Sequence, residues 1–423
     1  MGNLDSAPLV EHLFRHQAGR IVARLTRLLG PACVGLAEDV VQEAMLRALR
    51  TWPYDGIPDN PAGWLYRVAH NLAIDAVRRA HSFGDKTEAI VADLTQSGET
   101  ALPDETAPDD QLRDDELRMI FMCCHPQIAR DASVALSLKT VGGFSVREIA
   151  RAFLADETAI AQRIVRAKKQ IRDRRLTLDL PSGRALGERI DAVLDVIYFM
   201  FNEGYTAHDG ADLIRRDLCM EAIRLARLVA DTTLATPKSH ALVALMALQA
   251  ARFRARVDAA GDLVLLDDQD RALWDERLIA TGFAYFDRSL NGPDVSAYHV
   301  QAAIAATHAR AITPERLDWP LILELYDELL AIDPSPVVAL NRAVAVARVR
   351  GASEALAAVE RLARDPKLRH YHLLMSVRGQ LLADVGRTEE AARSFQAALD
   401  CENVSEPERR FLQKKLEACA SSA

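Results

Sequence analysis

Apolar residues along the chain recur with the 3.6-residue period of α-helices, and strand-like alternation is scarce. Residues 36–50 illustrate the pattern, because one face of a helix over this range is apolar and is expected to meet a core. The face consists of Val41, Ala44, Met45, Ala48 and Leu49. The apolar set is dominated by Ala, Leu and Val, with few aromatic residues. The pattern therefore predicts an all-α protein.

A second amphipathic helix is predicted over residues 61–79, with Asn60 as its N-cap and Pro61 at its first position. The arc expected to face inward consists of Leu65, Val68, Ala69, Leu72 and Ala76. A separate arc consists of Trp64, Arg67, Asn71, Asp75 and Arg78. An aromatic plane beside guanidinium and amide groups suits stacking on unpaired bases and contact with phosphates. Packing at the edge of a core is the commoner role of a lone Trp.

Residues 144–172 predict a helix-turn-helix. Ser145 and Glu148 form a capping box before a short helix over 146–153, and Asp156 is the N-cap of a second helix. The predicted buried stripe of that second helix is Ile160, Ile164, Ala167 and Ile171. The outward positions are Thr158, Ala161, Gln162, Val165, Arg166 and Lys169, with Arg163 and Lys168 on the flanks. A second helix with cations on its exposed side is typical of DNA recognition, whereas a solvated surface helix is the plainer interpretation.

The charge distribution supports DNA binding. The net charge is −8 over 423 residues, a length that predicts two to four domains. Residues 117–175 carry a net +7, whereas residues 81–116 carry −9 and residues 176–423 carry −7. A basic module between acidic segments is the kind of surface that phosphate backbones select. The acidic stretch contains Gly, Pro, Ser and Thr, and it is predicted to be a flexible linker.

Paired helices are predicted from about residue 185 to the C-terminus. Gly351 and Gly386 lie 35 residues apart, each between two helical segments, which matches a helical-hairpin repeat of about 34 residues. Residues 391–395 fit the small-then-aromatic packing of a tetratricopeptide second helix. Stacked hairpins present an extended concave surface, on which a protein or a ligand could bind.

Candidate chemistry is sparse. Neither a catalytic motif nor a phosphate loop is present, so we expect no enzyme, no metal and no cofactor. The six cysteines lack metal-ligand spacing and are expected to be buried thiols in a reducing cytoplasm. Asp267, Asp268 and Asp270 are expected to be a loop cluster rather than a cation site, and His299 and His308 fall on opposite helix faces. With no signal peptide and no membrane-length apolar run, we expect a soluble cytoplasmic protein.

The sequence Glu-Asp-Val-Val-Gln-Glu at 38–43, followed by residues 61–79, closely resembles domain 2 of extracytoplasmic-function (ECF) sigma factors. The resemblance spans residues 8–80. It implies that one helix docks on the clamp coiled coil of the polymerase β′ subunit through Asp39, Gln42, Glu43 and Leu46. It further implies that the next helix engages the −10 element, where a base is extruded as the duplex melts, through Trp64, Arg67, Asn71, Arg78 and Arg79.

Residues 144–172 are similar to the helix-turn-helix of sigma domain 4. The resemblance implies major-groove binding to the −35 element and contact with the polymerase β flap. The implied DNA-binding residues are Thr158, Gln162, Arg163, Arg166 and Lys169. Ala159, Ala161 and Val165 depart from the usual polar or cationic residues, so fewer base contacts and an unusual −35 preference are expected.

The segments 201–206, 216–227, 252–256 and 269–274 resemble those of an ECF subgroup with a tetratricopeptide-like C-terminus. The predicted organisation is domain 2 (8–80), a linker (81–116), domain 4 (117–178), a subgroup-specific helical domain (185–300) and tetratricopeptide-like repeats (301–420). The predicted function is a sigma factor regulated by its own extension, which is acidic enough to mask the basic module. The alternatives are a stand-alone helix-turn-helix regulator with a helical effector domain, and an interaction scaffold.

Overall fold

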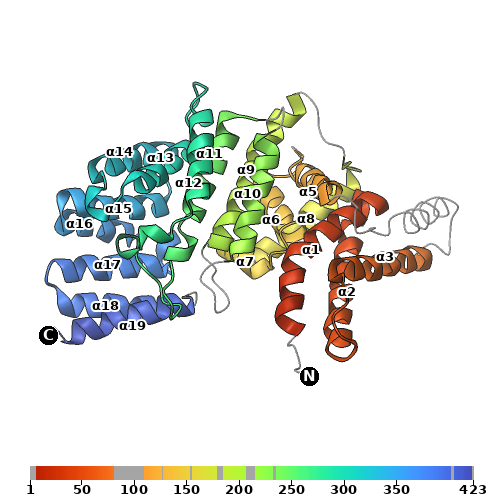
Figure 1. The fold of residues 1–423 in the computed structure, drawn as a ribbon, viewed down its shortest axis with the longest axis horizontal. Coiled ribbons are helices and arrows are strands. Elements are labelled where there is room, and N and C mark those ends of the chain that lie inside the picture. Colours follow the sequence, from red (N-terminus) through yellow and green to blue (C-terminus); the bar gives the residue numbers. More distant parts are fainter. Residues whose placement is uncertain are drawn as a thin grey trace. The chain divides into compact units, whose positions relative to one another are not determined.

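The computed structural model describes residues 6–80, 109–125, 127–152, 155–178, 184–205, 215–231, 235–401 and 404–421. The chain divides into two compact units, Met1–Met200 (unit 1) and Phe201–Ala423 (unit 2). Within the described residues the regular elements are helices, and the one β feature is an isolated antiparallel bridge between Val257 and Leu263 (Figure 1). The all-α prediction is confirmed.

Unit 1 begins with a three-helix region, coloured red to orange in Figure 1. Its elements are α1 (Ser6–Leu29), η1 (Pro31–Cys33), α2 (Val34–Asp55) and α3 (Pro61–Ala80). Helix α1 packs against α2 and α3, which also pack against each other. Asn60 caps α3 as predicted, because its Oδ1 accepts the backbone N–H of Gly63 at 2.8 Å.

A second group of helices completes unit 1. It contains α5 (Asp109–Cys123), α6 (Arg130–Thr140), α7 (Val146–Ala152), α8 (Glu157–Asp173) and the first part of α9 (Arg184–Tyr205). Helices α6, α7 and α8 pack on one another. Because α5 begins at Asp109, the last part of the predicted linker 81–116 is helical. Residues 81–108 lie outside the described part of the chain.

Unit 2 continues with helices that surround α11. The elements are α10 (Arg216–Ala230), α11 (Pro237–Ala250), η2 (Phe253–Ala255), η3 (Leu266–Asp268), η4 (Arg271–Leu273), α12 (Glu276–Ser289) and α13 (Ala297–Arg310). Helix α11 contacts α10, α12 and α13, and residues 241–248 are buried without interruption. A helix that is apolar on every side is expected at such a central position.

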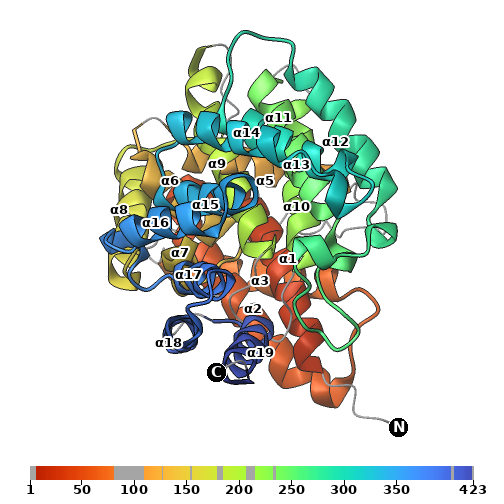
Figure 2. The same cartoon turned by 90° about the vertical axis from the view of Figure 1, so that its left-hand side faces the viewer.

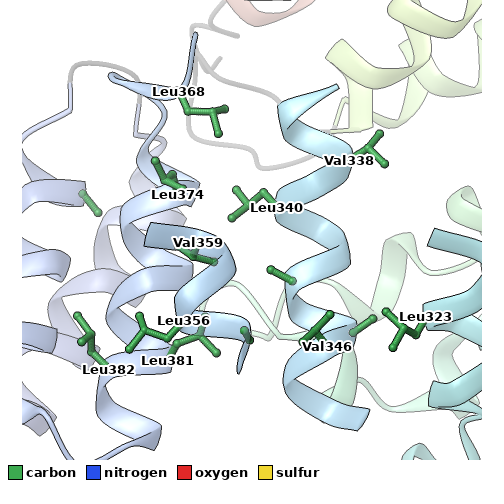
Figure 3. Packing of buried hydrophobic residues seen from close by; sticks show 14 of the residues in the cluster. Leu323, Val338, Leu340, Val346, Leu356, Val359, Leu368, Leu374, Leu381 and Leu382 are labelled. Carbon is green, nitrogen blue, oxygen red and sulfur yellow. The ribbon is translucent and has the colours of Figure 1, made fainter. Parts of the chain in front are cut away.

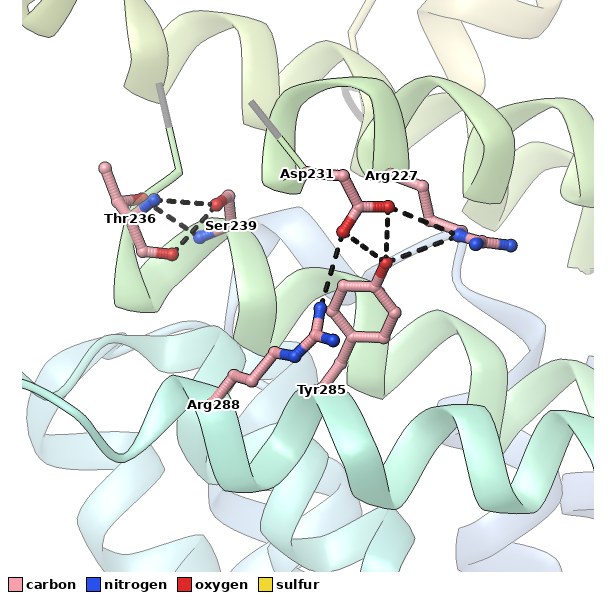
Figure 4. A network of polar contacts seen from close by, with 6 residues as sticks. All are labelled: Arg227, Asp231, Thr236, Ser239, Tyr285 and Arg288. Carbon is pink, nitrogen blue, oxygen red and sulfur yellow. Dashed lines mark hydrogen bonds and ion pairs between the residues drawn. The ribbon is translucent and has the colours of Figure 1, made fainter. Parts of the chain in front are cut away.

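A polar network joins the end of α10 to α12 (Figure 4). The Tyr285 hydroxyl donates to Asp231 Oδ1 at 2.6 Å and accepts a hydrogen bond from Arg227 Nε at 3.3 Å. Arg288 adds an ion pair to Asp231 at 3.4 Å. The capping box of Thr236 and Ser239 begins α11 nearby in the same view.

The rest of unit 2 is a stack of helices. The elements are η5 (Pro314–Arg316), α14 (Trp319–Ile332), α15 (Pro336–Arg350), α16 (Ala352–Leu362), η6 (Pro366–Leu368), α17 (His372–Asp384), α18 (Thr388–Leu399) and α19 (Glu406–Ser421). Each helix contacts the next along the chain, and Figure 2 shows α18 and α19 side by side below α17. A single apolar cluster runs through the stack (Figure 3).

The predicted glycine turns of these hairpins are confirmed. Gly351 (φ 94°) separates α15 from α16, and Gly386 (φ 80°) lies between α17 and α18. Such positive φ angles favour glycine. Phe395 is fully buried, and a Cβ added to Gly379 would lie 2.8 Å from its ring. Ala391 is buried as well, so the small-then-aromatic packing expected for residues 391–395 is present, whereas the tetratricopeptide assignment stays a prediction.

Candidate nucleic-acid interface

The second helix of the predicted helix-turn-helix is α8, and its buried face is the predicted one. Ile160, Ile164, Ala167 and Ile171 are each at most 6% exposed. The capping box before α7 is also present. Glu148 N–H donates to Ser145 Oγ at 3.1 Å, and Ser145 N–H donates to Glu148 Oε2 at 2.7 Å. Asp156 occupies the N-cap position of α8, but its side chain makes no capping hydrogen bond.

The implied −35 residues divide into two groups on α8. Thr158, Gln162, Arg166 and Lys169 are exposed. Arg163, in contrast, is half-buried and forms an ion pair with Asp131 at 3.3 Å. Four of the five side chains thus share an open face. To contact DNA, Arg163 would have to leave its ion pair with Asp131 and bind a phosphate instead. The neighbouring Val165 is 66% exposed, so this face is partly apolar.

The buried face of α3 lies at a different angle around the helix axis from the predicted one. Leu65 and Ala69 are buried as expected, but the stripe continues through Ala73 and Val77. Val68, Leu72 and Ala76 are half-buried at its edge. Helix α3 meets both α1 and α2, and two partners cover a wider arc than the single core assumed from sequence. Of the opposite arc, Arg67, Asn71, Asp75 and Arg78 are exposed as expected, and Arg79 is exposed as well.

Two aromatic residues near the α2–α3 connection were not identified from sequence. Trp52 is buried, and its ring meets Trp64 edge to face with centroids 5.4 Å apart. Trp64 is therefore half-buried rather than free. Tyr54, two residues after Trp52, is 88% exposed. Residues two positions apart along a helix are about 200° apart around its axis, so a helix extended to Asp55 would have predicted one buried and one exposed ring. The sequence prediction ended this helix at residue 50.

The residues implied in polymerase docking form one surface of α2. Asp39, Gln42 and Leu46 are exposed, and the half-buried Glu43 pairs with Arg47 at 3.0 Å. The predicted core stripe of α2 needs one correction: Leu49 is 41% exposed, because it lies at the edge of the arc that α1 and α3 cover. Leu46 is 47% exposed, so the surface is a mixed apolar and acidic one.

The two groups of unit 1 helices are joined by ion pairs whose carboxylates are buried. Asp115 of α5 has no exposed side-chain surface, and its carboxylate accepts hydrogen bonds from Arg24 (3.1 Å) and Arg27 (2.7 Å) of α1. Lys168 of α8 pairs with Glu38 of α2 at 2.5 Å. Unpaired charges avoid such burial, so the acidic end of the predicted linker serves here as a docking segment.

A close backbone approach adds to this contact. Gly19 of α1 lies so near Val141 that an added Cβ would be 1.8 Å from its carbonyl oxygen. We expect Gly19→Ala to lower the midpoint of thermal unfolding of unit 1, since overpacking against backbone commonly costs about 1–3 kcal/mol. Gly35→Ala on α2 is the matched control, because a Cβ there meets nothing within 4 Å. Equal midpoints for the two variants would contradict the close approach.

Chemistry beyond these surfaces is limited. Cys123, Cys124, Cys219 and Cys419 are buried thiols, and burial raises the pKa of Cys123 to about 11. Among the described residues no group of His, Cys, Asp and Glu could hold a metal ion. No described helix has the length and apolar character to span a bilayer. His299 is accounted for by hydrogen bonds to Ser296 and to the Ser289 carbonyl.

Comparisons with known proteins match three parts of the chain to family models. Residues 13–83 match the family model for Sigma-70 region 2, and residues 118–171 match Sigma-70, region 4. Residues 189–290 match a family of unknown function, DUF6596. None of the solved structures matches the chain.

Three relatives show how far the similarity extends along the chain. An uncharacterized protein of Rhizobium meliloti (strain 1021) is 43% identical over 86% of this chain and 85% of its own length. The ECF RNA polymerase sigma-E factor of Escherichia coli (strain K12) is 30% identical over 37% of this chain and 80% of its own length. The probable ECF RNA polymerase sigma factor SigI of Mycobacterium tuberculosis (strain ATCC 25618 / H37Rv) is 26% identical over 40% of this chain and 56% of its own length. The chain belongs to the family of ECF RNA polymerase sigma factors, which direct transcription initiation.

Proposed function

We propose that the chain docks on core RNA polymerase through α2, engages the −10 element through α3 and the −35 element through α8, and is regulated by unit 2. The observation that carries the proposal is α8, whose apolar stripe is buried while Gln162, Arg166 and Lys169 stay exposed. Such a helix after a capped short helix is the geometry that enters a major groove. Because polymerase is the partner, we expect the protein to act in the cytoplasm and to have no catalytic role of its own.

The −10 surface gains a further candidate from the exposure of Tyr54. An exposed ring is available to stack on an unpaired base, whereas the Trp64 ring is already packed against Trp52. Base–aromatic stacking is worth about 1–3 kcal/mol per base. We expect Tyr54→Ala to lower the open-complex fraction roughly fivefold or more, measured by permanganate reactivity of melted thymines. Tyr54→Phe, which keeps the ring, should stay near the native value, and equal loss in both variants would contradict stacking.

In unit 1, ion pairs hold the two DNA-binding regions in contact with each other, an arrangement that we call the closed state. Elements centred near −10 and −35 are separated by about 25 base pairs, or roughly 85 Å at about 3.4 Å per base pair. In unit 1, Lys168 of α8 touches Glu38 of α2, so both elements cannot be bound while this contact persists. Residues 81–108 could span about 90 Å when extended. We infer that promoter engagement separates the two regions and that this segment is the tether.

Transcription tests the proposal and the role of unit 2 together. The full chain should direct core polymerase to one start site on a cognate promoter, and failure to bind core polymerase would overturn the sigma assignment for this chain. A chain ending at Met200 keeps Arg189, which donates to the Phe121 carbonyl at 3.1 Å within unit 1. If the acidic residues 176–423 mask the basic module, promoter affinity of the shortened chain should rise and its dependence on salt should steepen.

Equal promoter affinity and equal salt dependence in the full and the shortened chain would contradict masking. The proposed role as a sigma factor would not be affected by this result. A stand-alone helix-turn-helix regulator remains the second candidate, and it predicts specific duplex binding without core polymerase. The match of residues 13–83 to Sigma-70 region 2 favours the sigma factor, since a stand-alone regulator has no need of a polymerase-docking region.

A further inference from the structure

Unit 2 contains two arginines that face the same buried ring. Trp274, between η4 and α12, is 6% exposed. The guanidinium of Arg271 lies 4.7 Å from the centre of this indole ring, and that of Arg252 lies 5.9 Å from it. Arg271 belongs to η4, whereas Arg252 lies between α11 and η2, so two separate segments bring these cations together.

The partners of both arginines are neutral. Arg271 Nη1 donates to the backbone carbonyls of His308 and Ala311, each at 2.7 Å. Arg252 Nη2 donates to the Tyr205 hydroxyl at 2.5 Å. In the part of the chain that the structure describes, neither forms an ion pair with a carboxylate. Carbonyl and hydroxyl dipoles solvate a guanidinium but do not neutralise it, so two positive charges remain beside one buried ring.

Nearby acids do not remove this excess. Burial and the proximity of Arg252 lower the pKa of Arg271, although Asp267 and Glu315 act in the opposite direction. Asp267 is itself engaged by Arg348. Burial together with Arg252 and Arg271 also lowers the pKa of His308 to about 4. The coulombic part of this effect, which comes from the two guanidiniums, favours an anion beside the imidazole.

Several nitrogen atoms around the ring lack a hydrogen-bond partner. They are Nε and Nη2 of Arg271, Nε1 of Trp274 and Nδ1 of His308. A buried donor without an acceptor costs about 1–3 kcal/mol. The three unpaired donors of Arg271 and Trp274 therefore point to an acceptor that arrives from outside. Arg252, Arg271 and His308 are half-buried, so the edge of the cluster is open to solvent, whereas the unpaired nitrogens themselves are buried.

We propose that Arg252, Arg271, Trp274 and His308 form a binding site for the phosphate dianion of a small phosphorylated molecule. A phosphate monoester carries about −1.5 to −2 charges near pH 7, which balances the two guanidiniums, whereas a carboxylate would balance one. The planar guanidinium fork matches phosphate oxygens in two-point hydrogen bonds. The extension would then carry the receptor for a chemical signal, which goes beyond the proposed sigma function.

A neighbouring arginine, Arg256, shows how an arginine with a purely structural role differs from Arg271. The Arg256 guanidinium lies 3.8 Å from the centre of the Tyr205 ring, and its Nη1 donates to the Tyr205 carbonyl at 2.5 Å. None of its nitrogens is among the buried atoms without a partner. Arg256 is thus explained by packing alone, whereas Arg271 leaves two nitrogens free.

Calorimetric titration of the full chain tests the site without polymerase or DNA, so its outcome is separate from that of the sigma proposal. The probes are inorganic phosphate and phenyl phosphate, with sodium acetate and sodium chloride at the same ionic strength. We expect saturable binding of a phosphate probe and none of chloride. Arg252→Gln and Arg271→Gln should each weaken binding at least tenfold. Arg254→Gln removes the same charge from an exposed position within η2 and should leave binding unchanged.

Trp274→Phe is a second variant, because it keeps an aromatic ring beside the guanidiniums but removes the indole N–H together with one ring of the indole. It should weaken phosphate binding severalfold while the circular dichroism spectrum stays native. Preference for phenyl phosphate over inorganic phosphate would indicate an organic monoester, and the reverse would indicate free phosphate; either supports a dianion site. Binding of acetate as tight as that of phosphate, absence of phosphate binding, or equal loss in Arg254→Gln would overturn the proposal.

Discussion

Arg166→Ala is expected to lower the affinity of the protein for a −35-containing duplex about tenfold to a hundredfold. Arg166 is exposed on α8, and its Nε donates to the Gln162 carbonyl at 3.2 Å. Within the described residues its Nη atoms have no hydrogen-bond partner, so they are available on the open face. A bidentate contact to guanine is worth about 1–3 kcal/mol. The measurement is a competition binding assay with the polymerase holoenzyme on duplexes that differ only in the −35 element.

The matched control is Arg172→Ala, which removes the same charge near the C-terminal end of α8, where Arg172 contacts Asp173 at 3.5 Å. Recognition helices place base-contacting residues toward their N-terminal part, so this variant should change affinity alike for all −35 sequences. If Arg166→Ala also weakens all sequences alike, Arg166 contacts phosphate and does not specify the base.

The helix that sequence predicted best is one whose buried residues form a single narrow arc. The stripe of α8 was predicted residue by residue, because Ile160, Ile164, Ala167 and Ile171 follow one helical period, although α6, α7 and η1 all pack against this helix. The capping box at Ser145 and the glycines at 351 and 386 are local features as well. Local geometry and a single buried arc can be predicted from the sequence without knowledge of the rest of the fold.

Features that depend on a partner far away in the sequence could not be predicted from the sequence. The burial of Ala73 and Val77 follows from α3 meeting two helices. Asp115 lies in a run of acidic residues that looks solvated in sequence, yet it is buried because Arg24 and Arg27 come from 88 or more residues earlier. The cluster around Trp274 likewise draws on three segments. Sequence identified segments 252–256 and 269–274 as unusual, but not that their arginines share one ring.

Asp115→Asn is expected to loosen the contact between α1 and α5 by about 2 kcal/mol. Removing one partner of a buried ion pair commonly costs about 3–5 kcal/mol, and the effect is reduced here because Arg27 is half exposed and can turn to solvent. Asn keeps the size of the side chain and removes its charge, which leaves Arg24 without an anionic partner in a largely buried place. About 2 kcal/mol corresponds to roughly a thirtyfold shift toward the separated regions.

Amide hydrogen exchange of the full chain, without polymerase, measures this shift. Amides of α5 and of the facing part of α1 should exchange roughly tenfold or more faster in Asp115→Asn, whereas α8 should keep its protection from its own apolar stripe. Asp131→Asn is the control, since its ion pair with Arg163 is within region 4 and its carboxylate side chain is 52% exposed. Unchanged exchange in Asp115→Asn would mean that apolar packing, and not the ion pairs, keeps the two regions together. Promoter engagement would then have to separate an apolar interface, with only weak dependence on salt.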